Sequence, residues 1–484
     1  MGTGHVMRCL ALAQAWQSHG PVHFLSVEIT PALEARLAQE GIISRALATA
    51  PGSAGDAEAT IAFASESGAV WLVADGYQFG ADYQQQLRNA GLRLLFFDDY
   101  GHAGDYCADL VINQNLGADA ALYARRTPHT RLLLGTRYAL LREEFLTWRE
   151  WQREIPSVAR KVLVTLGGAD PDNFTSRVVE ALDGLDVEAR ILVGGSNPHL
   201  EKLKSEIGNR KSGMELVVDS TKMPELMAWA DVAVAAGGST SWELAFMGLP
   251  SLVLVLAENQ VSIAAALEGA GVSINLGTQT CVTTEKIAAT LQALLTDVTR
   301  RTTMSQRGRQ LVDGGGASRI TTRLQSAGIN LRRAGQKDCR LLWEWVNDPV
   351  VRTSAFSSKP IPWENHQKWL TEKLTGSTSA IFIARNGAGT PFGQIRFDLN
   401  QQAEAQIDVS VDAPARQGGL GSALIRAGVD EMLLTTCVQV FHALVKKENE
   451  ASVRAFEKAG FRRAKLITER GQEAWHLTLA RNND

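Results

Sequence analysis

The sequence is poor in cysteine, with five residues among 484 and no C-x-x-C pair. An odd and scattered set supports neither a disulfide framework nor a zinc site, and it indicates reduced thiols in a cytoplasmic protein. No run of apolar residues approaches the length that spans a membrane, so we expect no membrane partner. The cysteines are Cys9, Cys107, Cys281, Cys339 and Cys437.

A strong charge of either sign is also lacking. The 49 Lys and Arg residues nearly balance the 52 Asp and Glu residues, and the formal net charge is -3. This balance gives no electrostatic reason to expect nucleic acid as a partner. No cluster of residues has metal-ligand spacing, so we expect chemistry without a metal. The hydrophobic fraction of 45% is that of an ordinary globular protein, and the length suggests about three domains.

The most informative stretch covers residues 231–260. An apolar run over 232–236 ends in two glycines, helix-forming residues follow over 239–247, and a second apolar run covers 252–256. A buried strand, a glycine turn, a helix and a second buried strand are typical of the βαβ unit of a parallel sheet.

The glycine turn of this unit is a candidate diphosphate site. Gly237 and Gly238 let the backbone approach a ligand, and the first helical amides, at residues 239–241, are expected to point free N–H groups toward it. Glu243 lies one turn further on, where a carboxylate accepts hydrogen bonds from a ribose diol in other nucleotide folds. The alternative interpretation is a structural turn with a solvated glutamate.

Residues 1–150 are expected to form a Rossmann-like domain. Apolar strand candidates alternate with helical segments there, as in a doubly wound parallel sheet. A glycine loop that enters a helix normally follows a strand, yet this loop begins at Gly2. We therefore expect the opening strand to lie upstream, within about 10 to 15 further residues. The strand candidates are residues 22–27, 69–75, 92–99 and 109–115.

Residues 151–327 repeat the pattern and predict a second Rossmann-like domain. Its five expected strands begin near residues 161, 189, 214, 232 and 252. Two such domains in tandem predict a ligand cleft between them, at the carboxyl ends of both sheets.

Residues 328–484 have a different character. A tryptophan-rich start is followed by three strand candidates at 380–385, 392–399 and 405–411, which predict an antiparallel meander. A glycine loop then opens an amphipathic helix over 416–433. The whole chain is therefore predicted to contain two tandem Rossmann-like α/β domains followed by an α+β domain.

Residues 1 to about 327 resemble the UDP-sugar hydrolase of pseudaminic acid biosynthesis, a relative of the two-domain glycosyltransferases of the GT-B fold. The resemblance rests on short motifs in a fixed order. They are G-T-G-H-V-M-R at 2–8, D-G-Y at 75–77, D-D-Y at 98–100, N-Q-N at 113–115, G-T-R-Y-A-L-L-R at 135–142, G-G-A-D-P at 167–171, G-G-S-T-S-W-E at 237–243 and N-Q at 259–260.

This resemblance implies a catalytic histidine in the G-x-G-H motif, which is His5. Imidazole titrates near neutrality and can take a proton from an attacking water. The alternative is a histidine that only packs or caps the helix start. The residues implied to bind the UDP-sugar are Gly4, Arg8, Asp75, Tyr77, Gly168, Gly237, Gly238, Ser239, Thr240, Glu243, Asn259 and Gln260.

Residues 329–484 resemble the GNAT acetyltransferases, in particular those that acetylate an amino group of a nucleotide-linked sugar. The acetyl-CoA signature R/Q-x-x-G-x-G/A is met at 416–421, and N-x-x-S-x-x-x-F is met at 449–456. Amides of the glycine loop would hold the CoA pyrophosphate, and the strand ending at Val411 would pair with the pantetheine arm. The implied acetyl-CoA residues are Val409, Val411, Arg416, Gln417, Gly418, Gly419, Leu420, Gly421, Ser422, Asn449 and Phe456.

One position departs from the GNAT pattern. Many members place a tyrosine near the CoA sulfur to reprotonate the thiolate, and this sequence has Phe456 there. Asp408 and His366 are candidate acceptors for the proton of the amine, each with a solvated or structural role as the alternative.

Together the two resemblances imply consecutive steps in one pathway. The GNAT part would acetylate the 4-amino group of a UDP-linked trideoxy-hexose, and the hydrolase would then release 2,4-diacetamido-2,4,6-trideoxy-altrose from UDP. Two alternatives stay open, a UDP-dependent glycosyltransferase and a binding protein that has lost one or both activities. The sequence specifies neither the stereochemistry of the sugar nor an oligomeric state.

Overall fold

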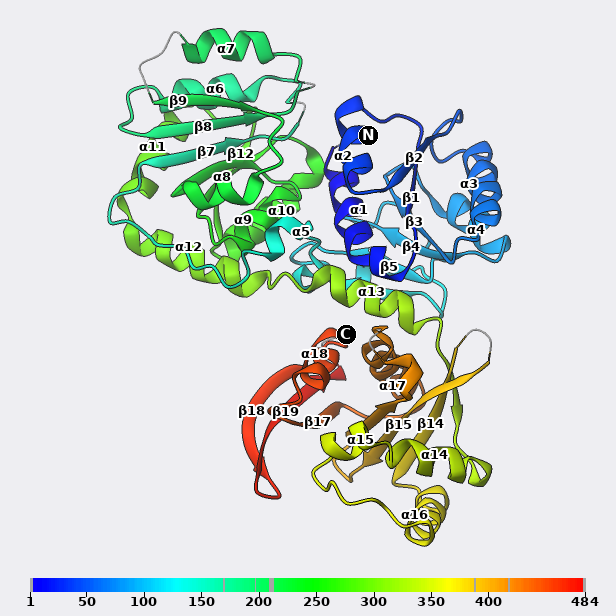
Figure 1. Ribbon diagram of the computed structural model, residues 1–484. Helices are drawn as coiled ribbons and strands as arrows, with labels where there is room; N and C mark the ends of the chain where they lie inside the picture. Colours follow the sequence, from blue (N-terminus) through cyan, green and yellow to red (C-terminus); the bar gives the residue numbers. More distant parts are fainter. Residues whose placement is uncertain are drawn as a thin grey trace. The chain divides into compact units, whose positions relative to one another are not determined.

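The structure is a computed structural model that describes residues 3–168, 170–195, 197–208, 213–386, 389–416 and 418–481, without the side chain of Thr3. The chain divides into two compact units, residues 1–317 and 318–484 (Figure 1). The predicted domain boundaries after residues 150 and 327 stay predictions. No described helix is both apolar enough and long enough to cross a bilayer.

The first half of unit 1 holds two parallel sheets, where the sequence predicts one. Strands β1 and β2 pair with each other, and β3, β4, β5 and β6 form a separate sheet in that order. The four predicted strands fall on β1, β3, β4 and β5. The strands are β1 His23–Ser26, β2 Ile43–Ala46, β3 Trp71–Asp75, β4 Arg93–Phe97, β5 Leu110–Asn113 and β6 Arg131–Leu134. The helical segments are α1 Thr3–Trp16, η1 Gln17–His19, α2 Pro31–Gln39, α3 Ala54–Ser67, α4 Ala81–Asn89, η2 Ala120–Tyr123, η3 Thr136–Tyr138 and α5 Glu143–Leu146.

The second half of unit 1 contains a six-stranded parallel sheet in the order β12-β11-β10-β7-β8-β9. The five predicted strands are present, and a sixth, β12, pairs along the outer edge of β11. The strands are β7 Lys161–Thr165, β8 Glu188–Val193, β9 Met214–Val218, β10 Val232–Ala236, β11 Ser251–Val255 and β12 Ser273–Thr278. The helical segments are α6 Phe174–Leu182, α7 Leu200–Gly208, α8 Met223–Trp229, α9 Thr240–Phe246, η4 Glu258–Gln260, α10 Val261–Gly269, α11 Thr284–Thr296 and α12 Val298–Leu311. Helix α13, Gly316–Ser326, begins in unit 1 and continues into unit 2.

The apolar runs of β10 and β11 are continuous because both faces of this sheet are covered. Val232 and Val234 pack on one face, while Ala233 and Ala235 pack in a different cluster on the other. Such a strand shows no alternation of polar and apolar residues, as expected for a central parallel strand.

Unit 2 is built on a seven-stranded sheet in the order β13-β14-β15-β16-β17-β19-β18 (Figure 1). The predicted meander is present as β14, β15 and β16, and β16 and β17 are the parallel neighbours. The strands are β13 Asn330–Arg333, β14 Ser379–Arg385, β15 Pro391–Leu399, β16 Glu404–Val411, β17 Val440–Lys446, β18 Arg462–Glu469 and β19 Gln472–Ala480. The helical segments are η5 Gln336–Asp338, α14 Cys339–Val346, α15 Pro349–Ser354, α16 Trp363–Thr375, η6 Ala413–Ala415, α17 Leu420–Thr435 and α18 Glu450–Lys458.

The two faces of this sheet have different neighbours. Phe382 and Ile395 point to a core that includes Leu424 of α17 and Val453 of α18. Ile381 and Ile383 point to the other face, where residues of α14 and α16 cover them. The alternation along β14 therefore places helices on both sides of the sheet.

Candidate active site

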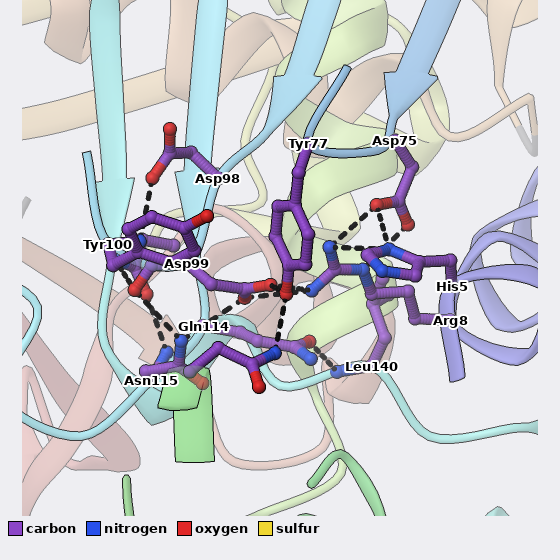
Figure 2. Close-up of polar contacts among 12 residues, drawn as sticks. His5, Arg8, Asp75, Tyr77, Asp98, Asp99, Tyr100, Gln114, Asn115 and Leu140 are labelled. Atoms are coloured by element: carbon purple, nitrogen blue, oxygen red, sulfur yellow. Dashed lines mark hydrogen bonds and ion pairs between the residues drawn. The ribbon is translucent and has the colours of Figure 1, made fainter. Parts of the chain in front are cut away.

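The polar residues of the first candidate site come from a helix start and from the ends of neighbouring parallel strands. His5 and Arg8 lie three positions apart in α1 and so share a face of that helix. Asp75 ends β3, and Asp98 and Asp99 follow β4 directly. Because the carboxyl ends of parallel strands meet at one edge of a sheet, Asp75 and Asp99 both reach Arg8 there, whereas Asp98 turns toward its own loop (Figure 2).

Asp75 holds both residues of α1. Its Oδ1 lies 2.6 Å from Nδ1 of His5, and Arg8 donates to both of its oxygens over 2.6 Å. Burial alone would raise the pKa of Asp75, but the charge and hydrogen bonds of Arg8, with the bond to His5, hold that pKa well below its ordinary value. Asp75 is therefore an anion at neutral pH.

An ionised Asp75 fixes the role of the two ring nitrogens of His5. A carboxylate only accepts hydrogen bonds, so Nδ1 carries the hydrogen that it donates to Asp75. Nε2 is then the proton-accepting nitrogen, and within the described residues it has no hydrogen-bond partner. The ring also packs edge-on against Tyr77, with 5.1 Å between centroids. This geometry suits a general base oriented by a carboxylate.

A second carboxylate, Asp99, joins the network from the other side of Tyr77 (Figure 2). It accepts from Arg8 at 2.8 Å, from the Tyr77 hydroxyl at 3.0 Å and from Nδ2 of Asn115 at 3.1 Å. Burial and the charge of Asp99 raise the pKa of Tyr77, so its phenol stays neutral. Sequence reasoning quoted Asp99 only within D-D-Y and missed it as a site residue. The available signal was an acidic residue directly after a buried strand.

Asp98 fixes the turn that carries Asp99. Its carboxylate accepts from the backbone amides of Tyr100, Gly101 and His102 and from the hydroxyl of Tyr106 at 2.7 Å. Burial opposes its ionisation, yet the hydrogen bonds from His102, Gly101 and Tyr106 lower its pKa to about 2. The turn is therefore held by a buried anion.

This anion predicts an acid sensitivity of unit 1. A carboxylate with a depressed folded-state pKa stabilises the fold above its unfolded pKa near 3.8, and that stability is lost as the pH falls toward about 2. The shift corresponds to about 2 kcal/mol at neutral pH. We expect Asp98→Asn to lower the unfolding free energy by about that amount at about pH 7, and by about 1 kcal/mol less at about pH 3. Urea unfolding at both pH values checks this, and an equal loss at both would contradict it.

The glycine turn after β10 comes close to the start of α1. A Cβ added to Gly4 would lie 3.2 Å from Oγ of Ser239, tighter than ordinary packing. On the same side, Nδ2 of Asn259 donates to the Tyr77 hydroxyl over 2.8 Å. The structure therefore brings together residues that the sequence assigns to two different domains.

Some backbone amides of this turn already donate hydrogen bonds within the protein, so they cannot all donate to a diphosphate. The amide of Gly237 donates to the carbonyl of Leu254, and the amide of Ser241 donates to that of Gly238, both over 3.0 Å. The expectation that the Ser241 amide is free is therefore wrong, because the first turn of the helix closes on itself. The other backbone amides of this turn are those of Gly238, Ser239 and Thr240.

Glu243 is ion-paired in this structure. Its Oε1 accepts from Nη2 of Arg142 at 2.9 Å, and Arg142 also contacts Glu144 at 3.0 Å. Arg142 lies in the segment that links the two halves of unit 1, so sequence reasoning, which treated Glu243 as solvated or ribose-bound, missed its partner. A ribose diol would share the carboxylate with Arg142.

Two further predicted residues have structural contacts. The carbonyl oxygen of Gly168 would lie 2.5 Å from a Cβ added to Gly194, so two glycine turns press together beyond β7 and β8. Oε1 of Gln260 accepts from the amide of Leu256 at 2.9 Å and so closes the turn after β11. Their predicted contacts with UDP stay predictions.

In unit 2, the predicted glycine loop leads from β16 into α17. Gly419 has a φ of +72° and precedes the first helical residue, which explains the need for glycine. Arg416 donates to the carbonyl of Val411 and pairs with Asp348 at 2.9 Å, and Oγ of Ser422 donates to the carbonyl of Gly419. Gln417 lies outside the described residues, and the roles of Val409, Gly418, Leu420 and Gly421 stay predictions.

The other two predicted acetyl-CoA residues belong to the start and the body of α18. Asn449 caps this helix by accepting from the amide of Ser452 at 3.2 Å. Phe456 is buried in the core and packs edge-on against Phe461. Their contact with CoA stays a prediction.

Comparisons with known proteins identify both parts of the chain. Residues 162–314 match the model of the glycosyltransferase family 28 C-terminal domain, and residues 329–462 match that of the acetyltransferase (GNAT) domain. The spore coat polysaccharide biosynthesis protein SpsG of Bacillus subtilis is 30% identical over 236 residues, covering 48% of this chain and 68% of that protein. The predicted combination of a GT-B-like α/β part and a GNAT part is confirmed.

Two further proteins show lower similarity to the chain. The pseudaminic acid cytidylyltransferase and UDP-2,4-diacetamido-2,4,6-trideoxy-beta-L-altropyranose hydrolase of Helicobacter pylori is 25% identical over 204 residues, covering 42% of this chain and 37% of that protein. A solved structure of the aminoglycoside acetyltransferase AAC(6')-Ib with coenzyme A is 22% identical with a TM-score of 0.29, covering 32% of this chain and 96% of that one.

Proposed function

We propose a function from one premise: the chain belongs to the family of the spore coat polysaccharide biosynthesis protein SpsG, and a GNAT acetyltransferase domain follows that part. The first activity is hydrolysis of UDP-2,4-diacetamido-2,4,6-trideoxy-β-L-altropyranose to the free sugar and UDP. The second is transfer of acetyl from acetyl-CoA to the 4-amino group of the UDP-amino-sugar precursor. The reduced cysteines fit a cytoplasmic site for both steps.

The arrangement of His5, Asp75 and Arg8 carries the hydrolase proposal. Nε2 of His5 takes a proton from water, whose oxygen then bonds to the anomeric carbon while the bond from that carbon to the UDP oxygen breaks. Asp75 keeps Nδ1 protonated and stabilises the imidazolium that forms. UDP leaves with the bonding electrons, and the remaining amides after Gly237 supply hydrogen bonds to its phosphates.

Two contacts support a shared site for base and nucleotide. Gly4 lies against Ser239, and Tyr77 is bonded to Asn259, so the helix that carries His5 and the glycine turn assigned to UDP are neighbours within unit 1. A water held at Nε2 of His5 is then close to a sugar whose diphosphate occupies that turn.

A glycosyltransferase is the second candidate, because residues 162–314 match a glycosyltransferase family 28 domain. In that reaction His5 would take a proton from an acceptor hydroxyl instead of from water. Faster release of UDP with an added acceptor, with the sugar then attached to that acceptor, would favour the transferase. Release of free sugar that is faster without an acceptor than with one would favour the hydrolase. A binding protein without activity would hold UDP and CoA but form no product.

We expect the full chain to give two products in sequence. With acetyl-CoA and the UDP-linked 4-amino sugar, mass spectrometry should first detect the acetylated UDP-sugar and then free diacetamido sugar with UDP. In H₂¹⁸O the released UDP should carry no ¹⁸O, because water attacks carbon and not phosphorus. Labelled UDP, or no free sugar without an acceptor, would contradict the hydrolase.

A further inference from the structure

Two histidines of the sheet in unit 2 contact each other, and sequence reasoning assigned neither of them. Nδ1 of His442 on β17 lies 2.9 Å from Nε2 of His476 on β19, with the rings inclined by 26°. A hydrogen bond between imidazoles needs one donor and one acceptor, so the pair shares a single proton at this contact. Nε2 of His442 faces β16, where Glu404 Oε2 lies 3.5 Å away, and it has no hydrogen-bond partner within the described residues.

The pair occupies a distinctive place in the sheet. Strands β16 and β17 pair over three residues each, and the last pair is Gln406 with His442. Beyond this point no pairing of the two strands is found in the part of the chain that the structure describes, although β16 continues to Val411. His442 therefore lies where the two parallel strands separate.

The face on which the pair lies is accessible. Register places His442 beside Gln406, and Asp408 follows on the same face, opposite the face that packs on α17. Gln406 and Asp408 are exposed, and both histidines are partly exposed. Nε2 of His442 is itself covered, beside Glu404, so an amine that approaches from the face opposite α17 reaches this atom when the partly exposed Glu404 side chain moves aside.

The next step rests on the proposed acetyltransferase function. If the CoA pyrophosphate binds at the glycine loop after β16, the pantetheine arm runs back along the unpaired edge of this strand. From Gln406 to Val411 the strand advances five residues, about 16 Å at about 3.3 Å per residue. That is a length an extended pantetheine arm can follow, and it directs the thioester toward the point of strand separation.

We propose that His442 is the proton acceptor of the acetyl transfer and that His476 is its positioning residue. Nε2 of His442 removes a proton from the acceptor ammonium, and the freed lone pair attacks the thioester carbonyl carbon. A C–N bond forms, the C–S bond breaks, and the CoA thiolate leaves with the bonding electrons. The imidazolium of His442 returns the proton to that thiolate, directly or through water. The nitrogen still carries a second proton of the former ammonium, and it releases this proton to water to give the neutral amide.

This assignment accounts for Phe456. A phenylalanine cannot reprotonate the thiolate, and its ring is buried against Phe461. An imidazole pair that both takes and returns the proton needs no tyrosine at that position. The acetyl transfer is then complete with the residues present.

The two earlier candidates are less suited to the task. Asp408 is ion-paired with Arg396 at 2.8 Å, so its carboxylate already has a cationic partner. His366 is only 3% exposed and packs against Trp369 in α16.

The charges around the pair favour a single shared proton. Burial, with His442 and Lys465 of β18, lowers the pKa of His476. Further charged groups of this face are Glu404 and Asp408 on β16, Lys446 on β17, the Arg396–Asp398 pair on β15 and Arg352 of α15. A second proton on the pair would place two cations in contact.

The test uses the full chain, acetyl-CoA and the UDP-linked 4-amino sugar, with release of the CoA thiol as the signal. We expect His442→Gln to lower kcat about 10²-fold while the Kd of acetyl-CoA stays within about twofold. His476→Gln should lower kcat about 10-fold and move the acidic limb of the kcat–pH profile. Arg454→Gln, which removes an exposed ion pair with Glu450 on α18, is the matched control and should change neither quantity.

The assignment would be overturned if both histidine variants kept more than a third of kcat and left the acidic limb of the kcat–pH profile unmoved. If His442→Gln no longer binds acetyl-CoA, the His476→Gln variant tests the assignment instead. The acidic limb of its kcat–pH profile moves only when the histidine pair titrates in the reaction. Absence of thiol release from the unaltered protein would instead refute the acetyltransferase function itself, and this assignment with it.

Discussion

His5→Ala is expected to lower the rate of UDP release about 10³-fold, within the range of about 10² to 10⁴ that general-base catalysis contributes. The physical reason is the loss of Nε2, the ring nitrogen that the bond between Nδ1 and Asp75 leaves as a proton acceptor. The Kd of UDP should change less than about threefold, because the amides assigned to the diphosphate belong to the turn after β10. Single-turnover hydrolysis and calorimetric UDP titration measure the two quantities.

Two companion variants separate proton transfer from packing. His5→Gln keeps a polar side chain of similar length but no basic nitrogen, so it should be as slow as His5→Ala. His19→Ala removes an exposed histidine in the 3-10 segment after α1 and should retain full rate. A His5→Ala protein that keeps more than half of its turnover would refute the role of His5 as base.

Gly421→Glu is expected to abolish acetyl transfer and spare hydrolysis of a substrate that is already acetylated. Gly421 follows the first residue of α17, in the loop assigned to the CoA pyrophosphate. A carboxylate there places a negative charge beside two phosphates, and we expect the Kd of acetyl-CoA to rise about 10²-fold or more, about 3 kcal/mol. Calorimetry with acetyl-CoA and the rate of UDP release are the two measurements.

Gly421→Ala is the matched control for this change. Among the residues that the structure describes, a Cβ at this position would meet only Cγ2 of Val411, at 3.9 Å, which is ordinary van der Waals contact. The alanine variant should therefore bind acetyl-CoA within about threefold of the unaltered protein. If Gly421→Glu lost UDP release as well as acetyl transfer, the cause would be misfolding and not a local charge effect.

Local patterns in the sequence determined most of the secondary structure around both candidate sites. The apolar runs predicted at 232–236 and 252–256 became β10, Val232–Ala236, and β11, Ser251–Val255. Buried parallel strands are continuous apolar runs interrupted by glycine turns, so neighbouring residues suffice to identify them. Strand β12 escaped prediction because its residues, S-I-N-L-G-T, mix polar and apolar types without either strand pattern.

The partners of the site residues depended on the tertiary structure. His5 meets Asp75 across 70 positions, Arg8 meets Asp99 across 91, and Arg142 meets Glu243 across 101. Motif resemblance named one or both members of these pairs but not the contacts between them. Which strand ends lie side by side follows from the order β3-β4-β5-β6 in the sheet, and no local pattern encodes that order.

The histidine pair of unit 2 shows the same division between sequence and structure. His442 and His476 each lie in a strand that alternates polar and apolar residues. In such a strand the sequence predicts no more than a partly solvated side chain for a single histidine. Only the antiparallel register of β17 with β19, which sets Leu444 opposite His476, brings the two rings within hydrogen-bond distance. A shift of that register by one residue would turn one of the rings to the opposite face of the sheet, because side chains alternate along a strand.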